Sequence, residues 1–401
     1  MSSSPASKSP AASAVAEDFS LVLGGPLYQL FLRTRLARPP LQLLHRRMVV
    51  IPLLAWIPLL VLSTLAGHAV GGVGLPFLHD IETYARFLVA LPLLILAEPV
   101  VDSWTREIVQ QFRERGIVPA RSLPRFQYAV DSAARWRNST MVELVLLAAV
   151  LLLAPRLWQY GIALHSDTWY ASVPEGRVDL TQAGWWFVHV SGPMFQFLLL
   201  RWWFRLAIWW RFLWQVSRLP LEVRAVHPDR SGGLGFLGEG IYGFMPLLFA
   251  QGAVVSGLIA NRVLTGARTA VEFGGEIALL VVILVAQVLV PSLYFVPDLV
   301  AARRDGLRRY GALAALHARE FERKWMDETK PSDDALVGSP DISSLADLGA
   351  SSDVVHEMRP VPFDLRVLVQ LLAISVAPFA PLVLTVIPLS DLLQRVAGML
   401  L

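Results

Sequence analysis

Uncharged apolar stretches long enough to cross a bilayer are the feature that most limits what this chain can fold into. A membrane-spanning helix needs about 20 mostly apolar residues to cross roughly 30 Å of hydrocarbon. Four stretches reach that length without a charged residue, namely residues 48–67, 241–261, 277–297 and 367–390. In lipid the backbone must satisfy its own hydrogen bonds, which an α-helix does within one segment. The sequence therefore predicts an all-α, polytopic transmembrane helix bundle.

Three further stretches are predicted to span, although each is shorter or contains charge. Residues 183–200 are uncharged and continue into the sequence RWWFR, whose long side chains can reach the headgroups. Residues 87–104 and 139–158 carry charges near their ends, where a charge can reach water at low cost. These charges are Glu98, Asp102, Glu143 and Arg156. The prediction is about seven spans.

The distribution of Lys and Arg supports this number. The chain has 401 residues and is 17% charged, whereas a soluble domain has about 25% charged residues. With seven spans and the N-terminus inside, six of the 35 Lys and Arg residues lie outside, and inner loops are expected to be the basic ones. These six are Arg86, Arg156, Arg177, Arg262, Arg268 and Arg395. We therefore predict a cytoplasmic N-terminus and an external C-terminus.

The predicted organisation has four parts. They are residues 1–47, a disordered tail and basic membrane-surface segment; residues 48–297, six spans with the inner loops 103–138 and 201–240; residues 298–363, a cytoplasmic helical extension and linker; and residues 364–401, the final span and a short tail. A solvated linker is an equal alternative for residues 21–44. The prolines of the last apolar stretch leave a re-entrant hairpin as an alternative to a seventh span.

Residues 225–240, AVHPDRSGGLGFLGEG, form the most suggestive polar segment. Free N–H groups at the start of the following helix could form a nest for an anion such as phosphate. The favoured alternative is a glycine-rich turn that returns the chain to the membrane, with Glu239 capping the helix. The candidate functional residues here are His227, Asp229, Arg230, Ser231, Gly232, Gly233, Gly235 and Glu239.

More specific interpretations of this segment fail on context. Gly233, Gly235 and Gly238 spell G-x-G-x-x-G, but a dinucleotide site needs a preceding strand and a crossover helix. The tripeptide that begins at His227 resembles the HPD motif of J-domain cochaperones, yet Trp-rich, membrane-proximal sequence precedes it. His227 and Asp229 lack the further ligands that a metal requires, and the chain has no Cys. No metal site or cofactor is predicted.

A second candidate site consists of polar residues inside the apolar stretches. They are His189, Gln196, Gln251 and Gln287. Such residues could line a path for a solute or proton. The favoured alternative is hydrogen-bonding between helices, helped by small residues such as Gly252, Ser256 and Ala260.

Three segments resemble a family of multi-pass bacterial membrane proteins. They are HPDRSGGLGFLGE, YGALAALHAREFERKW and SLADLGASSDVVHEMRPVPF. The resemblance extends from about residue 48 onward. It implies a bacterial inner membrane but transfers no activity and no catalytic residues.

The function that we expect is signalling, assembly or regulation through the cytoplasmic face, with a protein partner or an anionic ligand. One alternative is a small-solute or ion transporter or channel that uses the polar midplane. Another is an enzyme that modifies lipid at the inner interface, although no recognisable catalytic constellation is present. The bilayer is the expected surrounding, and nucleic acid is not an expected partner, because the basic blocks are explained by orientation.

Overall fold

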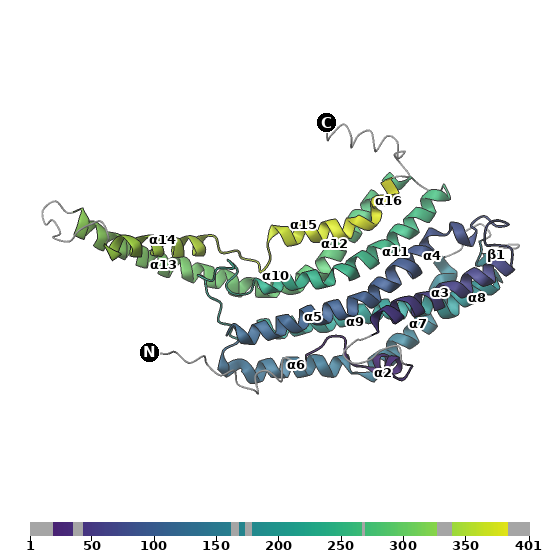
Figure 1. Ribbon diagram of the computed structural model, residues 1–401, viewed down its shortest axis with the longest axis horizontal. Helices are drawn as coiled ribbons and strands as arrows, with labels where there is room; N and C mark the ends of the chain where they lie inside the picture. Colours follow the sequence, from purple (N-terminus) through teal and green to yellow (C-terminus); the bar gives the residue numbers. More distant parts are fainter. Residues whose placement is uncertain are drawn as a thin grey trace.

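The computed structural model describes residues 19–34, 43–161, 168–172, 179–266, 269–326 and 339–383. These residues are 79% helical and 2% strand, so the predicted mostly helical fold is confirmed. Figure 1 shows the long helices running roughly side by side in an elongated bundle. The tail 1–16, most of the linker 328–340 and the end of the last apolar stretch lie outside the described residues.

The long helices coincide with the apolar stretches and with parts of the inner loops and the cytoplasmic extension. They are α3 (Leu44–Leu65), α5 (Leu91–Glu114), α6 (Leu123–Arg137), α7 (Thr140–Gly161), α9 (Gly192–Ser217), α11 (Met245–Leu264), α12 (Gly274–Leu289), α13 (Val296–Trp325), α14 (Pro340–His356) and α15 (Leu365–Val376). Shorter helices are α2 (Pro26–Arg33), α4 (Ile81–Tyr84), α8 (Gln182–Trp186), α10 (Phe236–Gly240) and α16 (Ala380–Val383). Strands β1 (Ala171–Ser172) and β2 (Asp179–Leu180) pair antiparallel, with Ala171 opposite Leu180.

Prolines mark points where the helical geometry changes. The π-helical turns Ala85–Ala90 and Phe187–Ser191 lead directly into α5 and α9, whose second residues are Pro92 and Pro193. A proline has no N–H to donate, so the regular hydrogen-bond ladder is interrupted where it enters a helix. The two helices continue through these points as long rods, since the backbone changes its pitch instead of leaving the helix.

Within the described residues, five rods are long and apolar enough to cross a membrane. They are Leu44–Leu65, Ile81–Glu114, Phe236–Leu264, Ala270–Trp325 and Leu365–Leu382. They contain the four uncharged stretches, wholly or in part, and one of the charged ones, so the chain is an integral membrane protein. The number seven is not reached: α9 is not among these rods, and α7 counts only as the shorter apolar helix Thr140–Leu152.

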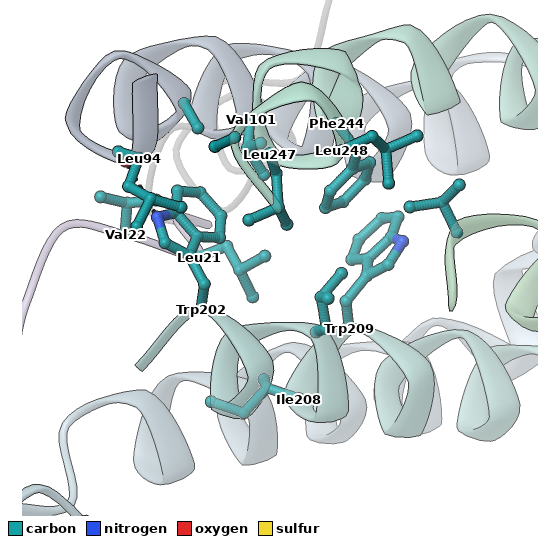
Figure 2. Packing of buried hydrophobic residues seen from close by; sticks show 14 of the residues in the cluster. Leu21, Val22, Leu94, Val101, Trp202, Ile208, Trp209, Phe244, Leu247 and Leu248 are labelled. Atoms are coloured by element: carbon teal, nitrogen blue, oxygen red, sulfur yellow. Dashed lines mark hydrogen bonds between the residues drawn. The ribbon is translucent and has the colours of Figure 1, made fainter. Parts of the chain in front are cut away.

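The N-terminal plug, residues 19–25, inserts between the rods. Leu21 and Val22 are each 1% exposed, and Figure 2 shows them among the buried side chains around Trp202. The indole Nε1 of Trp202 donates to the carbonyl oxygen of Leu94 on α5 at 2.9 Å. The surface location expected for this segment is not observed at Leu21 and Val22, because apolar side chains gain more by filling the space between helices than by lying at the interface.

Helices α13 and α14 form a hairpin, the arm, that projects from one end of the bundle (Figure 1). Asp341 at the start of α14 accepts hydrogen bonds from Lys324 Nζ at 2.8 Å and from Trp325 Nε1 at 3.2 Å. Gly306 lets the helices approach closely, since an added Cβ would lie 3.0 Å from a methyl group of Val355. Helix α13 of the arm belongs to the same continuous rod, Ala270–Trp325, as α12.

Candidate functional site

The glycine-rich segment folds around one of its own carboxylates. Asp229 Oδ1 accepts hydrogen bonds from the backbone N–H groups of Ser231 at 2.8 Å and Gly233 at 3.1 Å. Asp229 Oδ2 accepts from the N–H of Gly235 at 2.9 Å. Gly233 has a φ of 95°, a conformation that favours glycine. We call residues 227–235 the Asp229 turn.

The Asp229 turn binds the chain that leaves the arm. The backbone N–H of Arg359 donates to the carbonyl oxygen of Arg230 at 2.7 Å, and Arg359 Nη2 donates to the carbonyl oxygen of Asp229 at 2.9 Å. An exposed ion pair joins Arg230 to Glu357 at 2.9 Å. Because two of these contacts use backbone atoms, the turn and the connection after α14 hold each other in a fixed register.

The same segment packs against α5 and α13. Gly232 has a φ of 64°, and a Cβ there would come within 2.2 Å of Val223 and 3.3 Å of Leu299 on α13. Phe236, just after the turn, meets Phe112 of α5 edge to face with ring centroids 5.0 Å apart. The segment is therefore the joint at which the arm, the connection after α14 and a membrane rod come together.

The negative charge of the turn belongs to one of its own side chains, the carboxylate of Asp229. Burial raises the pKa of Asp229, but the N–H groups of Gly235, Ser231 and Gly233, with His227 beside it, hold the pKa below its usual range. His227 Nδ1 lies 2.9 Å from Asp229 Oδ1. The three N–H groups that could form a nest for a phosphate thus already bind Asp229.

Glu239 does not form the predicted N-terminal cap of α10, the helix that follows the turn. Glu239 is exposed, and α10 has no side-chain cap at its N-terminus. Instead, the N–H of Gly235, the N-cap residue of α10, donates to Asp229. Asp229 can accept this hydrogen bond because the turn brings its carboxylate to the N–H six positions further along the chain, whereas Glu239 lies within the helix.

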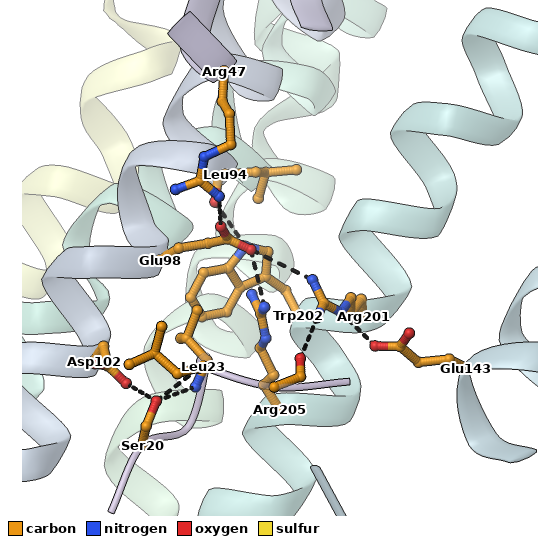
Figure 3. A network of polar contacts seen from close by, with 12 residues as sticks. Ser20, Leu23, Arg47, Leu94, Glu98, Asp102, Glu143, Arg201, Trp202 and Arg205 are labelled. Atoms are coloured by element: carbon orange, nitrogen blue, oxygen red, sulfur yellow. Dashed lines mark hydrogen bonds and ion pairs between the residues drawn. The ribbon is translucent and has the colours of Figure 1, made fainter. Parts of the chain in front are cut away.

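A buried ion network joins four helices (Figure 3). Glu98 on α5 accepts hydrogen bonds from Arg47 Nη1 at 2.6 Å and from Arg205 Nη2 at 2.9 Å. Arg201 Nη1 lies 3.6 Å from the same carboxylate, and Arg201 Nε donates to Glu143 at 3.0 Å. All five side chains are at most 7% exposed. We call these five residues the ion network.

The N-terminal plug contacts this network directly. Arg201 Nη2 donates to the carbonyl oxygen of Gly24 at 3.3 Å, and Arg137 Nη1 donates to that of Ser20 at 2.6 Å. The hydroxyl of Ser20 donates to the carboxylate of Asp102, as Figure 3 shows. Chain ahead of the first membrane rod thus covers charges that come from α5 and α9.

The expectation that the charges near the span ends reach water is wrong for Glu98, Asp102 and Glu143. They are 4%, 5% and 6% exposed; the side chain of Arg156 lies outside the described ones. Burying an ion costs several kcal/mol unless a partner compensates it, and the arginines provide that partner. The sequence did contain a signal for this pairing, since carboxylates and arginines lie at the same ends of neighbouring predicted spans.

The polar midplane residues do not gather at one point. His189 is exposed and stacks on Trp185, with ring centroids 4.8 Å apart. Trp203 Nε1 donates to Gln251 Oε1 at 3.3 Å, and Trp210 Nε1 donates to the backbone oxygen of Gln287 at 2.8 Å. These two tryptophans are seven residues apart on α9, which separates the contacts by about 10 Å along the helix.

Gln196 on α9 and the small residues of α11 complete this picture. Gln196 Oε1 is buried with no hydrogen-bond partner among the described residues. Ser256 Oγ donates to the carbonyl oxygen of Pro378 at 2.7 Å, and Gly252 allows Pro378 to approach α11. On another side of α11, Gly257 faces Ala85. These contacts support the interpretation of small and polar residues as the means of helix association.

The comparisons with known proteins supply no activity to transfer to this chain. The resemblance of its polar segments to a bacterial membrane protein family gains no support from them, so any function must be argued from the contacts above. No protein-family model, no curated protein and no solved structure matches this chain.

Proposed function

We propose that this protein is a seven-span component of a bacterial inner membrane, with its N-terminus and arm in the cytoplasm and its C-terminus outside. Two further helices, α7 and α9, pack against one another and supplement the five apolar rods. Counting both as spans leaves six of the 35 Lys and Arg residues outside, as the positive-inside rule requires.

The role that the geometry supports best is to couple the membrane bundle to a cytoplasmic protein, in signalling, assembly or regulation. One observation carries this proposal: the Asp229 turn fastens the base of the arm to a membrane rod. Arg359 binds the turn at 2.7 Å on one side, and Phe236 packs on α5 on the other. A displacement of α5 therefore moves the arm as well, because close hydrogen bonds and ring packing connect the two.

The arm offers a surface suited to a protein. Leu313 is 49% exposed and Leu316 is 48% exposed, and their spacing of three residues places them on one face of α13. Ile342 on α14 is 43% exposed. An amphipathic helix or an apolar groove of a partner is the chemistry that recognises such positions. A protein partner is favoured over an anionic ligand, since the donors of the Asp229 turn already bind a carboxylate.

The function is tested by photo-crosslinking in cells. A photoreactive side chain at Leu316 is compared with one at Val70, which is 69% exposed between α3 and α4. We expect a discrete crosslinked protein from position 316 alone, and less of it when Asp229→Ala loosens the base of the arm. A product that forms equally from both positions, or that is insensitive to Asp229→Ala, would count against coupling through this turn.

The topology is tested separately by labelling. Because the chain has no Cys, single-cysteine variants can be read without background. Val271 is 72% exposed and lies in the connection between α11 and α12. We expect Val271→Cys to react with a membrane-impermeant maleimide on spheroplasts, and Leu316→Cys to react only after lysis. The reverse labelling pattern would mean that the protein has the opposite orientation in the membrane, and it would not contradict the contacts between the arm and the Asp229 turn.

A further inference from the structure

A basic cavity lies where α13 meets the connection that follows α14. Its volume is about 530 Å³. Its walls are Val300, Arg303, Arg304, Leu307, Arg308 and Pro360. One face of α13 thus presents arginines interleaved with aliphatic side chains, and Pro360 closes the opposite wall.

The positive charge of this cavity is incompletely neutralised. Arg304 has no ion-pair partner within the part of the chain that the structure describes. Arg303 Nη2 donates to a backbone carbonyl at 3.1 Å, whereas its Nε is buried with no hydrogen-bond partner among the described residues. Arg308 and Arg309 share the carboxylate of Asp305, each at 2.7 Å. Three arginines therefore line the cavity, and the acid beside them, Asp305, is shared between Arg308 and Arg309, which favours an anion as the occupant.

The depth of the cavity indicates which anion. Pro297 ends the uncharged stretch of the rod, and Arg303 follows six residues later, about 9 Å along a helix. The headgroup region extends roughly 5–8 Å beyond the hydrocarbon on each side of a bilayer. Val300, between them, is 46% exposed and apolar. The backbone of Arg303 thus lies near the outer edge of the headgroup layer, from which its long side chain reaches back to the lipid phosphates, and Val300 lies on the side of the hydrocarbon.

We propose that this cavity binds the phosphate headgroup of an anionic phospholipid of the inner leaflet. Arg304, with Arg303 beside it, pairs with the phosphate, and Val300, on the membrane side of the arginines, contacts the glycerol and the first methylenes of the lipid. A soluble phosphate would have no use for the aliphatic wall, and an acidic protein segment would have to enter the headgroup layer. The cavity also includes Pro360, next to the Arg359 that binds the Asp229 turn, so the lipid would brace the base of the arm.

The experiment uses the purified full-length protein in a neutral detergent. Short-chain phosphatidylglycerol is titrated while intrinsic tryptophan fluorescence and thermal unfolding are recorded, with short-chain phosphatidylcholine and inorganic phosphate as parallel probes. The variant Arg303→Gln/Arg304→Gln is compared with Arg319→Gln/Arg323→Gln, which removes the same charge from exposed positions further along α13. The single variant Arg304→Gln is included because it removes no contact that the structure records, so it should fold.

We expect phosphatidylglycerol alone to bind and to raise the unfolding temperature. Each juxtamembrane arginine contributes roughly a five-fold factor in affinity for anionic lipid, so the double variant should bind about 25-fold more weakly, and Arg304→Gln about five-fold. The Arg319/Arg323 variant should bind as the wild type does. Equal binding of phosphatidylcholine or of inorganic phosphate, or equal weakening by both double variants, would overturn the proposal. This assay needs neither a protein partner nor an orientation, so its failure would leave the proposed function untouched.

Discussion

Arg205 Nη2 lies 2.9 Å from Glu98 Oε1, and both side chains are nearly inaccessible to solvent. The two residues are more than a hundred positions apart in sequence and come from α9 and α5. Glu98 also binds Arg47, so one carboxylate holds together the beginning of the first rod, the middle of the second and α9. The stability of this part of the bundle therefore depends strongly on a single acid.

Replacing Glu98 should be among the most damaging substitutions in the membrane region. Glu98→Gln leaves Arg47, Arg201 and Arg205 buried without their shared anion, and an uncompensated buried charge costs roughly 3–5 kcal/mol. Thermal unfolding in detergent, followed by circular dichroism, measures the effect. Glu107→Gln is the matched control, because Glu107 lies on the same helix and is exposed. Equal losses in the two variants would contradict the role given to the network.

The N-terminal plug should behave as part of the core. Leu21 is 1% exposed, so Leu21→Ala should lower stability by about 2–5 kcal/mol through lost burial and a cavity. Leu313→Ala on the arm, where the side chain is 49% exposed, should change stability by less than about 1 kcal/mol. The melting temperatures of both variants in the same detergent provide the comparison. A neutral Leu21→Ala would mean that the plug does not pack in solution as it does here.

The Asp229 turn should make stability depend on acid pH. The pKa of Asp229 is lowered in the folded protein, so its contribution is fully present above the unfolded pKa of about 4 and is lost as the pH falls through the folded value. Asp229→Asn should cost about 2–3 kcal/mol near neutral pH, because an amide nitrogen cannot accept from the N–H of Gly235. The gap between wild type and variant should narrow below pH ~4. A gap that is constant down to pH ~2 would exclude the carboxylate as its source.

The left-handed backbone of the turn provides a test that is independent of charge. Gly232→Ala should be destabilising by at least about 1–2 kcal/mol, because its φ is 64° and a Cβ would meet Val223 at 2.2 Å. Gly311→Ala is the matched control. Gly311 is exposed within α13 and has nothing within 4 Å of an added Cβ, so alanine there should stabilise by about 0.5–1 kcal/mol. Chemical or thermal unfolding of both variants tests the opposite signs, and like signs would contradict this backbone description.

The sequence by itself determined which segments are helical and which of them are apolar enough for a membrane. Gly116 and Pro119 lie between α5 and α6, and the helical extension predicted to start at residue 298 coincides at its start with α13. These features depend on residues within one or two turns of each other, so local periodicity and local breakers specify them. The glycines of the Asp229 turn also marked a tight turn correctly, since only the backbone conformation was at issue.

Only the tertiary structure decided how charges and polar groups are satisfied. Glu98 was predicted to be a charge near a span end, because the residues next to it in the sequence do not indicate that Arg47 and Arg205 are its partners. The donors of the glycine-rich segment looked free for an anion until the fold of the turn brought Asp229 onto them. Two side chains pair in this way only if they lie at the same depth in the membrane and on the facing sides of helices that are far apart in sequence. The order of residues along the chain does not contain this information. The apolar rods follow from composition, whereas their electrostatic partners follow from packing.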